Sequence, residues 1–276
     1  MRLALFSIFG LLALTSCQVP SSISLDPVPL SGNKANSKFS KSILAGLDAP
    51  TWGQQELESG IPGWDFQIDD RYTSVSTSQK VIAITFDDGP HGSNTPRLLD
   101  MLKQRNVKAT FYVVGDMITG NPSSAPGLLR RMVAEGHEIG NHTVTHGTLS
   151  RMSNDALRSE LSRAHKLILK ETGVAPRSMR PPGGAIKSDQ RKLMLEEFGY
   201  PTILWSVDPE DWKRPGPSVV TSRLLKGASP GGILLVHDLH KPTVDAMPST
   251  LDQLLAQGYK FVTISELIAL DERKKE

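Results

Sequence analysis

The chain has 276 residues, of which 38% are hydrophobic and 22% are charged, and its formal net charge at pH 7 is +2. These values are typical of a soluble globule that holds one large domain or two small ones, and they do not predict a nucleic-acid partner. We find no Walker-type phosphate loop, dinucleotide glycine fingerprint or aromatic-basic RNA motif in the sequence, which argues against nucleotide-dependent and RNA-binding functions.

The N-terminal segment has the pattern of an export signal. Arg2 supplies a positive charge, and Leu3 to Leu14 form an apolar run that is too short to span a bilayer. Thr15 and Ser16 then precede Cys17, the only cysteine in the chain. This arrangement resembles the lipobox of bacterial lipoproteins, which implies a signal peptide over residues 1–16 and a membrane anchor on lipidated Cys17. A plain secretory signal is the alternative.

A lipidated Cys17 leaves no thiol for a disulfide or a cysteine-ligated zinc ion in the folded domain. Gln18 follows the cysteine, at a position where an Asp would favour retention of a lipoprotein in the cytoplasmic membrane. Analogy with known lipoproteins therefore favours the periplasmic face of the outer membrane over the outer face of the cytoplasmic membrane. Residues 17–50 are rich in Ser, Pro, Asn and Lys and are expected to form a flexible tether.

Residues 51–79 are expected to form an irregular extension packed on a domain that covers residues 80–276. In that domain short apolar runs alternate with helical patterns. The strands are expected over residues 81–86, 109–114, 137–141, 178–181, 202–207, 233–236 and 261–264. The helices are expected from residue 95, over 128–135, from the cap at Ser153 to Gly173, and over 188–198, 219–226 and 251–257.

About seven strand–helix units in series predict an α/β fold with a parallel sheet, closed or nearly closed into a barrel. In such barrels the functional residues lie at the C-terminal ends of the strands. The first strand, which is apolar on both faces, ends in Asp87 and Asp88. Two adjacent carboxylates repel each other, and a cation would relieve that cost. The alternative is a pair of solvated turn aspartates before Gly89.

Polar residues also follow the later strands. His142 and His146 lie four residues apart, a spacing that places two side chains on one face of a helical turn, where two imidazoles can bind one metal. The alternative is a pair of surface histidines with no ligand. Arg180 precedes a rigid turn that exposes a backbone N–H at Gly183 or Gly184, and such a donor is suited to stabilising an oxyanion. The alternative is a purely structural turn in which Arg180 forms a salt bridge. Further along come Asp208, Asp211, Trp212, His237 and Asp238.

Together these residues resemble the polysaccharide deacetylase family, also called carbohydrate esterase family 4 or the NodB homology domain. The resemblance covers roughly residues 78–270. The five motifs that carry it are Thr85-Phe86-Asp87-Asp88-Gly89-Pro90, His142-Thr143-Val144-Thr145-His146, Arg180-Pro181-Pro182-Gly183-Gly184, Asp208-Pro209-Glu210-Asp211-Trp212 and Leu235-Val236-His237. The family fold is a distorted (β/α) barrel, in agreement with the pattern of strands and helices.

The resemblance implies one divalent metal bound by Asp88, His142 and His146, which is usually zinc, with cobalt or another transition metal as alternatives. Three protein ligands leave positions open for water and substrate. Asp87 would be the general base, with Arg180 behind it.

The same resemblance implies that Gly183 donates its N–H to the oxyanion and that His237, from the far side of the barrel, protonates the leaving amine. Asp208 would stabilise the imidazolium of His237. Trp212 and Leu235 would line a pocket for the acetyl methyl group. Many family members have an aromatic residue at the position of Gly183, so a cleft-lining side chain is missing here.

The implied activity is metal-dependent removal of N-acetyl groups from an envelope polysaccharide, with release of acetate. Lipid anchoring favours N-acetylglucosamine of peptidoglycan as the substrate. Chitooligosaccharide, poly-N-acetylglucosamine and acetylated xylan are alternatives, and a non-catalytic glycan-binding lipoprotein is a competing class. The expected partners are the glycan and the membrane, with no nucleic acid, and the expected state is a monomer.

Overall fold

The computed structural model describes residue 64 and residues 66–274. The predicted signal peptide, the tether with Cys17, and residues 51–63 lie outside the described residues. The strands are β1 (Arg71–Tyr72), β2 (Val81–Asp87), β3 (Thr110–Val113), β4 (Glu138–Asn141), β5 (Thr202–Ile203), β6 (Gly232–His237) and β7 (Lys260–Phe261). The helices are α3 (Asn94–Gln104), α4 (Gly115–Thr119), α5 (Ala125–Ala134), α6 (Asn154–Thr172), α7 (Ser188–Phe198), α8 (Pro217–Gly227), α9 (Lys241–Ala256) and α10 (Ile264–Ala269).

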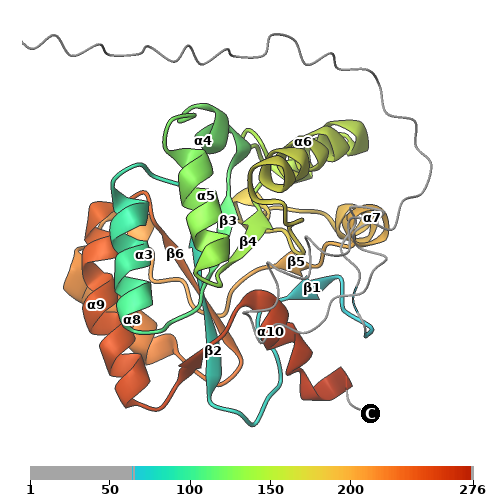
Figure 1. The fold of residues 1–276 in the computed structure, drawn as a ribbon. Coiled ribbons are helices and arrows are strands. Elements are labelled where there is room, and N and C mark those ends of the chain that lie inside the picture. The colour runs from blue at the N-terminus through green and yellow to red at the C-terminus, as the bar shows by residue number, and fades with distance from the viewer. Residues whose placement is uncertain (1–63, 65, 275–276) are drawn as a thin grey trace, which may run out of the picture. The chain divides into compact units, whose positions relative to one another are not determined.

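The strands form a parallel sheet that curves towards a barrel. The order is β4-β3-β2-β6, with β7 beside the start of β2, and β1 pairs separately with β5. Isolated parallel bridges at Met179 connect β4 to β5, and a bridge from Val207 to Leu234 leads on to β6. The wall is therefore completed by single bridges and not by continuous strand pairing. The predicted α/β fold with parallel strands is confirmed, and α3, α5, α8 and α9 lie outside the strands (Figure 1).

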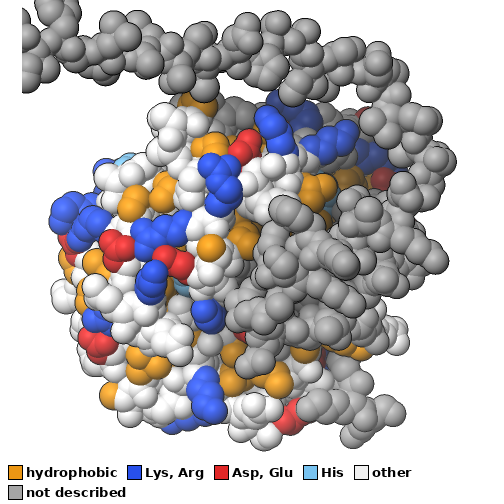
Figure 2. Space-filling view, in the orientation of Figure 1, with side chains coloured by type: hydrophobic (Ala, Val, Ile, Leu, Met, Phe, Trp, Pro, Cys, Tyr) orange, Lys and Arg blue, Asp and Glu red, His pale blue; other side chains and the backbone are white. Residues whose placement is uncertain are grey.

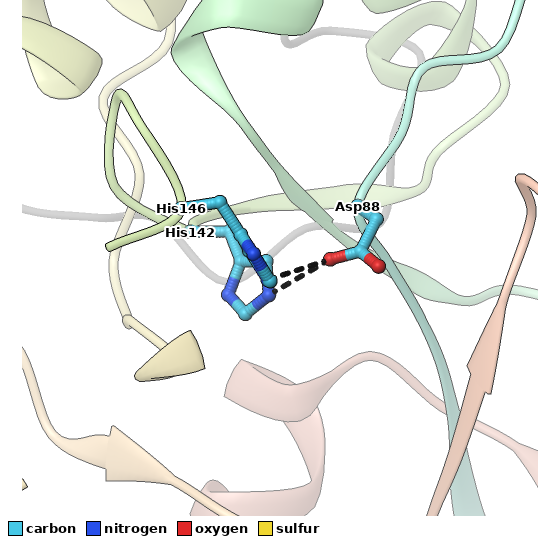
Figure 3. Close-up of side chains that lie close together, drawn as sticks. All are labelled: Asp88, His142 and His146. Atoms are coloured by element: carbon cyan, nitrogen blue, oxygen red, sulfur yellow. Dashed lines mark ion pairs between the residues drawn. The ribbon is translucent and has the colours of Figure 1, made fainter. Parts of the chain in front are cut away.

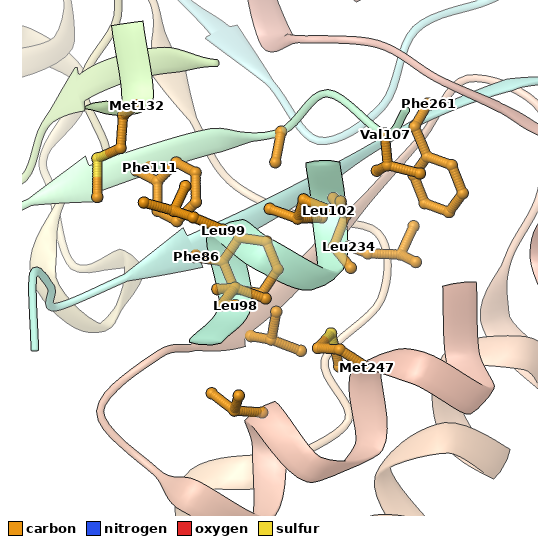
Figure 4. Close-up of a cluster of buried hydrophobic side chains, with 14 of the residues drawn as sticks. Phe86, Leu98, Leu99, Leu102, Val107, Phe111, Met132, Leu234, Met247 and Phe261 are labelled. Carbon is orange, nitrogen blue, oxygen red and sulfur yellow. The ribbon is translucent and has the colours of Figure 1, made fainter. Parts of the chain in front are cut away.

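The core explains why β2 is apolar throughout. All seven residues of β2 are buried. Ile84 and Phe86 belong to a cluster that includes Leu98 and Leu102 of α3, whereas Ala83 belongs to a second cluster on the other side of the strand. Figure 4 shows Phe86 beside Leu98 and Leu102 in the first cluster. Burial of both faces is usual for a strand in a parallel sheet, and it confirms this part of the prediction.

The helix predictions were more accurate than the strand predictions. The helix capped by Ser153 and closed by Gly173 is confirmed as α6, where the Ser153 hydroxyl accepts from Ala156 N at 3.3 Å and Gly173 has φ 72°. By contrast, α4 and α10 were not predicted. The helix α9 begins ten residues before the predicted start and contains Pro248, a residue that usually ends a helix. The fourth strand is reduced to the bridges at Met179, and the fifth stops at Ile203.

The described part of the N-terminal extension contacts the barrel. Trp64 donates its indole N–H to Gly199 O at 3.2 Å, and Ser76 O accepts from Glu272 N at 2.8 Å. The extension is not irregular throughout, because it contains β1. Among the described residues, no helix combines the length and the apolar character needed to cross a bilayer.

Charged side chains of both signs are interspersed on the face drawn in Figure 2, in the region of α3 and α5. Arg131 of α5 illustrates this mixture, because it pairs with Asp100 of α3 at 2.5 Å and with Glu135 at 2.9 Å. Such exposed pairs each contribute about 0–1 kcal/mol to stability, so packing of the apolar core dominates the fold.

Candidate active site

The predicted site residues converge on one cavity at the C-terminal ends of the strands. The cavity has a volume of about 360 Å³. Its lining consists of Asp87, Asp88, His142, His146, Gly183, Trp205, Asp208, Trp212, Leu235 and His237. Every site residue predicted for the folded domain is in this set except Arg180, which lies behind Asp87. Trp205 was not predicted as a site residue, because the fifth strand was expected to continue to residue 207, whereas β5 stops at Ile203 and leaves Trp205 beyond its end.

Asp88, His142 and His146 form a cluster suited to one metal ion (Figure 3). Asp88 Oδ1 lies 3.3 Å from His142 Nε2 and 3.0 Å from His146 Nε2. Asp88 adopts the left-handed conformation, with φ 73°, directly after the strand ends. One carboxylate and two imidazoles match the donor set of a catalytic zinc site, which leaves further positions open.

The hydrogen bonding of His142 supports this assignment. His142 Nδ1 is 2.7 Å from Arg180 O, and because a carbonyl oxygen only accepts, Nδ1 must carry the hydrogen. Nε2 therefore faces Asp88 Oδ1 at 3.3 Å, and it can bind a metal there when it carries no hydrogen. Two acceptors in contact repel each other unless a cation or a proton lies between them. Burial works against the ionised carboxylate, but the two histidines outweigh it and hold the pKa of Asp88 well below its usual range.

The two histidines do not lie on a helical turn, so that expectation was wrong. They belong to a loop in which Thr143 and His146 have positive φ values of 67° and 57°. These two left-handed residues bring the rings to a centroid separation of 5.0 Å. The His142 side chain is buried, whereas that of His146 is 44% exposed. Positive φ is uncommon outside glycine, and the spacing of the residues does not predict it.

Asp87 is held by a buried charge partner. Its Oδ1 accepts from Arg180 at 2.7 Å, and its Oδ2 lies 3.7 Å from His142 Nε2. The Arg180 guanidinium is fully buried and also donates to the Thr85 hydroxyl and to the carbonyls of Ile203 and Leu204. Oδ2 of Asp87 is thus on the side of the metal cluster, while Oδ1 is occupied.

The carboxylate behind His237 is Asp211, and the prediction of Asp208 was wrong. Asp211 Oδ1 is 2.8 Å from His237 Nδ1, and its Oδ2 accepts from His237 N and from the Thr243 hydroxyl. Asp208 is exposed and accepts from Glu210 N at 2.7 Å. Both aspartates follow the fifth strand, but Glu210 turns the chain in the left-handed conformation, with φ 54°, and this directs Asp211 inward.

His237 also lies nearer to Asp87 than expected. β6 is the direct neighbour of β2 and not a strand on the far side of the barrel, and Asp87 and His237 are partners in the parallel register. Burial opposes a charge on the imidazole, but the hydrogen bond to Asp211 and the charges of Asp211, Asp87 and Asp88 raise the pKa of His237 to about 9. A bound cation would offset the contributions of Asp87 and Asp88.

The remaining residues line the mouth and wall of the cavity. Gly184 donates its N–H to Pro181 O at 2.9 Å, so Gly183, with φ 60°, is the better candidate for an oxyanion donor. Leu235 is buried in the wall, whereas Trp212 is 51% exposed at the mouth. An Asp-His-His cluster beside a carboxylate and a carboxylate-paired imidazole is the type of site that metal-dependent hydrolases use.

Comparison with known proteins agrees with this class. Residues 74–203 match the family model described as polysaccharide deacetylase. The chain is 45% identical over 190 residues to the peptidoglycan-N-acetylglucosamine deacetylase PgdA of Listeria monocytogenes, covering 69% of this chain and 39% of that protein. It is 41% identical over 221 residues to a peptidoglycan-N-acetylglucosamine deacetylase of Bacillus cereus, covering 78% of this chain and 97% of the relative.

Among solved structures, a pseudoenzyme of carbohydrate esterase family 4 from Bacillus anthracis superposes with a TM-score of 0.66 at 31% identity, covering 71% of this chain and 67% of that one. The chain spans about two fifths of the length of the Listeria relative, but nearly all of the B. cereus relative. The chain therefore belongs to the polysaccharide deacetylase family.

Proposed function

We propose that the protein hydrolyses N-acetyl groups of an envelope polysaccharide, and that its substrate is N-acetylglucosamine of peptidoglycan. The observation that carries this proposal is the pairing of two differently supported proton-transfer groups beside one metal cluster. Asp87 is paired with a buried arginine, and His237 is paired with the buried carboxylate of Asp211. Amide hydrolysis requires both a base and an acid, because an amine leaves poorly unless it is protonated.

Asp88, His142 and His146 would hold a divalent metal, which supplies Lewis-acid polarisation of the acetyl carbonyl and a more acidic water. Asp87 takes a proton from the attacking water while the oxygen of that water forms a bond to the acetyl carbon. The Gly183 N–H donates to the carbonyl oxygen, where negative charge develops. His237 transfers its Nε2 proton to the amide nitrogen as the carbon–nitrogen bond breaks, which yields acetate and a free amine.

The donor set of the site bears on the identity of the metal, and the relatives bear on the identity of the glycan. One carboxylate with two imidazoles favours zinc, and cobalt suits the same donors. The names of the Listeria and B. cereus relatives favour N-acetylglucosamine of peptidoglycan over chitooligosaccharide, poly-N-acetylglucosamine or acetylated xylan. The likeness to a pseudoenzyme keeps a non-catalytic glycan-binding protein as the second candidate, but here the complete set of base, acid and metal-binding residues favours catalysis.

Acetate release from purified murein tests the activity. We expect release that stops when a chelator removes the metal and returns when zinc or cobalt is added. A panel of murein, chitooligosaccharide, poly-N-acetylglucosamine and acetylated xylan ranks the substrates by kcat/KM. Binding of glycan without acetate release from any of them, in protein loaded with either metal, would establish the non-catalytic alternative.

We further propose that the protein is exported as a monomer and anchored by lipid on Cys17, at the periplasmic face of the outer membrane. The support is the lipobox-like sequence that ends in the only cysteine. We expect Cys17→Ala to move the protein from the membrane fraction to the soluble fraction of lysed cells, with Ser21→Ala in the predicted tether as a control. Unchanged membrane partitioning of Cys17→Ala would contradict the anchor.

A further inference from the structure

The loop that carries His142 and His146 is held by side chains of neighbouring segments. Because its left-handed residues prevent regular hydrogen bonding, its backbone N–H groups need other acceptors. Thr143 N donates to Asn141 Oδ1 at 2.8 Å, and His146 N donates to the Thr143 hydroxyl at 3.1 Å. The two N–H groups between them, those of Val144 and Thr145, both donate to one oxygen of Glu160, at 3.0 and 2.8 Å.

Glu160 is an unusual residue to find in this place. It lies on α6, its exposed fraction is 8%, and within the described residues no Lys or Arg forms an ion pair with it. A buried carboxylate without a cationic partner is costly unless its hydrogen bonds are strong. Two charge-assisted bonds to adjacent backbone N–H groups supply that compensation, and they fix the middle of the loop.

The two histidines differ in how much they depend on the loop. His142 is buried, and its Nδ1 is anchored to Arg180 O. His146 is 44% exposed, and its position depends on the backbone that Glu160 holds directly before it. Asn141 braces the other side of the loop, since it also donates to Leu161 O at 3.0 Å. Loss of the bonds to Glu160 would therefore release His146 before His142.

We propose that Glu160 is a positioning residue of the metal site, which holds His146 at its 3.0 Å separation from Asp88 Oδ1 by binding two successive N–H groups of the loop. This inference rests on the metal site proposed above. Residues that orient metal ligands without touching the metal commonly change metal affinity by about 10–100-fold when they are removed.

The test is the zinc affinity of the purified full-length protein, measured by competition with a chromophoric chelator. We expect Glu160→Ala to weaken zinc binding by about 10–100-fold. Glu160→Gln, which keeps an oxygen acceptor, should recover most of the affinity, to within about fivefold of the wild type. The matched control is Glu171→Ala, on the same helix, which removes a carboxylate paired with Arg130 and should leave zinc affinity unchanged.

A double-mutant cycle separates positioning of His146 from general damage to the fold. In a His146→Ala background, adding Glu160→Ala should cause almost no further loss of zinc affinity. Melting temperatures of the metal-free variants report on folding. If Glu160→Ala does not fold, Glu160→Asp replaces it with the same predicted direction, because its shorter side chain withdraws the oxygen from both N–H groups.

The outcomes distinguish the two levels of the proposal. Wild-type protein that binds neither zinc nor cobalt would overturn the metal site and this inference together. Wild-type protein that binds zinc, with equal affinity in Glu160→Ala, would overturn only the role of Glu160. The same holds if Glu160→Ala costs as much affinity in the His146→Ala background as it does in the wild type.

Discussion

Replacement of Asp87 by Asn should lower kcat by about 10²–10⁴-fold while zinc still binds, because the base is lost but the three metal ligands remain. In the structure Asp87 contributes no atom to the Asp-His-His cluster, and its Oδ1 is occupied by Arg180. Acetate release at saturating zinc measures the activity, and equilibrium dialysis measures the bound metal. Asp88→Asn is the matched control at the adjacent position, and we expect it to lose both activity and metal.

The same substitution should also destabilise the protein, since it leaves the Arg180 guanidinium buried without a counter-charge. Breaking a buried ion pair from one side commonly costs about 3–5 kcal/mol. The bonds of Arg180 to the Thr85 hydroxyl and to two carbonyls remain, so we expect a cost near the lower end of that range. Urea unfolding measures it. If Asp87→Asn lost zinc as readily as Asp88→Asn, the division of roles between the two aspartates would be wrong.

The sequence predicted those parts of the site that depend only on strand order. The C-terminal ends of parallel strands meet at one end of a barrel, so Asp87, His142 and His237 could be brought together without knowledge of the loops. The expectation that His237 lies on the far side of the barrel was wrong because it needed the order of the strands. The order of strands around the barrel was not readable from the chain, and β6 proved to be the neighbour of β2.

Features of the site that depend on the backbone conformation of a loop could not be derived from the spacing of the residues. The choice between Asp208 and Asp211 depends on the left-handed conformation of Glu210, and the meeting of His142 with His146 depends on Thr143 in the same conformation. Neither residue is a glycine, so composition gave no sign of either turn. Glu160 was missed for a related reason, since its partners are main-chain N–H groups, which are the same in every sequence.

Asp211→Asn should lower kcat by about 10²–10³-fold, whereas Asp208→Asn should change it by less than about threefold. Asp211 is buried and accepts from the ring of His237, while Asp208 is exposed and accepts from Glu210 N in its own turn. The neutral amide that Asp211→Asn introduces would no longer stabilise the imidazolium, and the NH₂ group of that amide would favour the wrong tautomer of His237. Equal losses in the two variants would contradict the assignment of Asp211.

The pH dependence gives this comparison a second readout. His237 must be protonated to act as the acid, so activity should fall as the pH rises through its pKa, which is about 9 before a cation offsets the neighbouring carboxylates. Asp211→Asn should move this decline to lower pH by about 1–3 units, and Asp208→Asn should not move it. Rate profiles of kcat at saturating metal measure the decline.

The unfolding free energy of the metal-free protein should also depend on the protonation of His237. Because the pKa of His237 is raised on folding, its contribution is fully present below the unfolded value near 6.5 and is lost as the pH rises through about 9. The full contribution amounts to at most about 3 kcal/mol. Asp211→Asn should remove most of this loss of stability between pH 6.5 and 9, so that its unfolding free energy varies less with pH than that of the wild type or Asp208→Asn. A wild-type unfolding free energy that stays constant across this range would contradict a raised pKa and leave Asp211 without its electrostatic role.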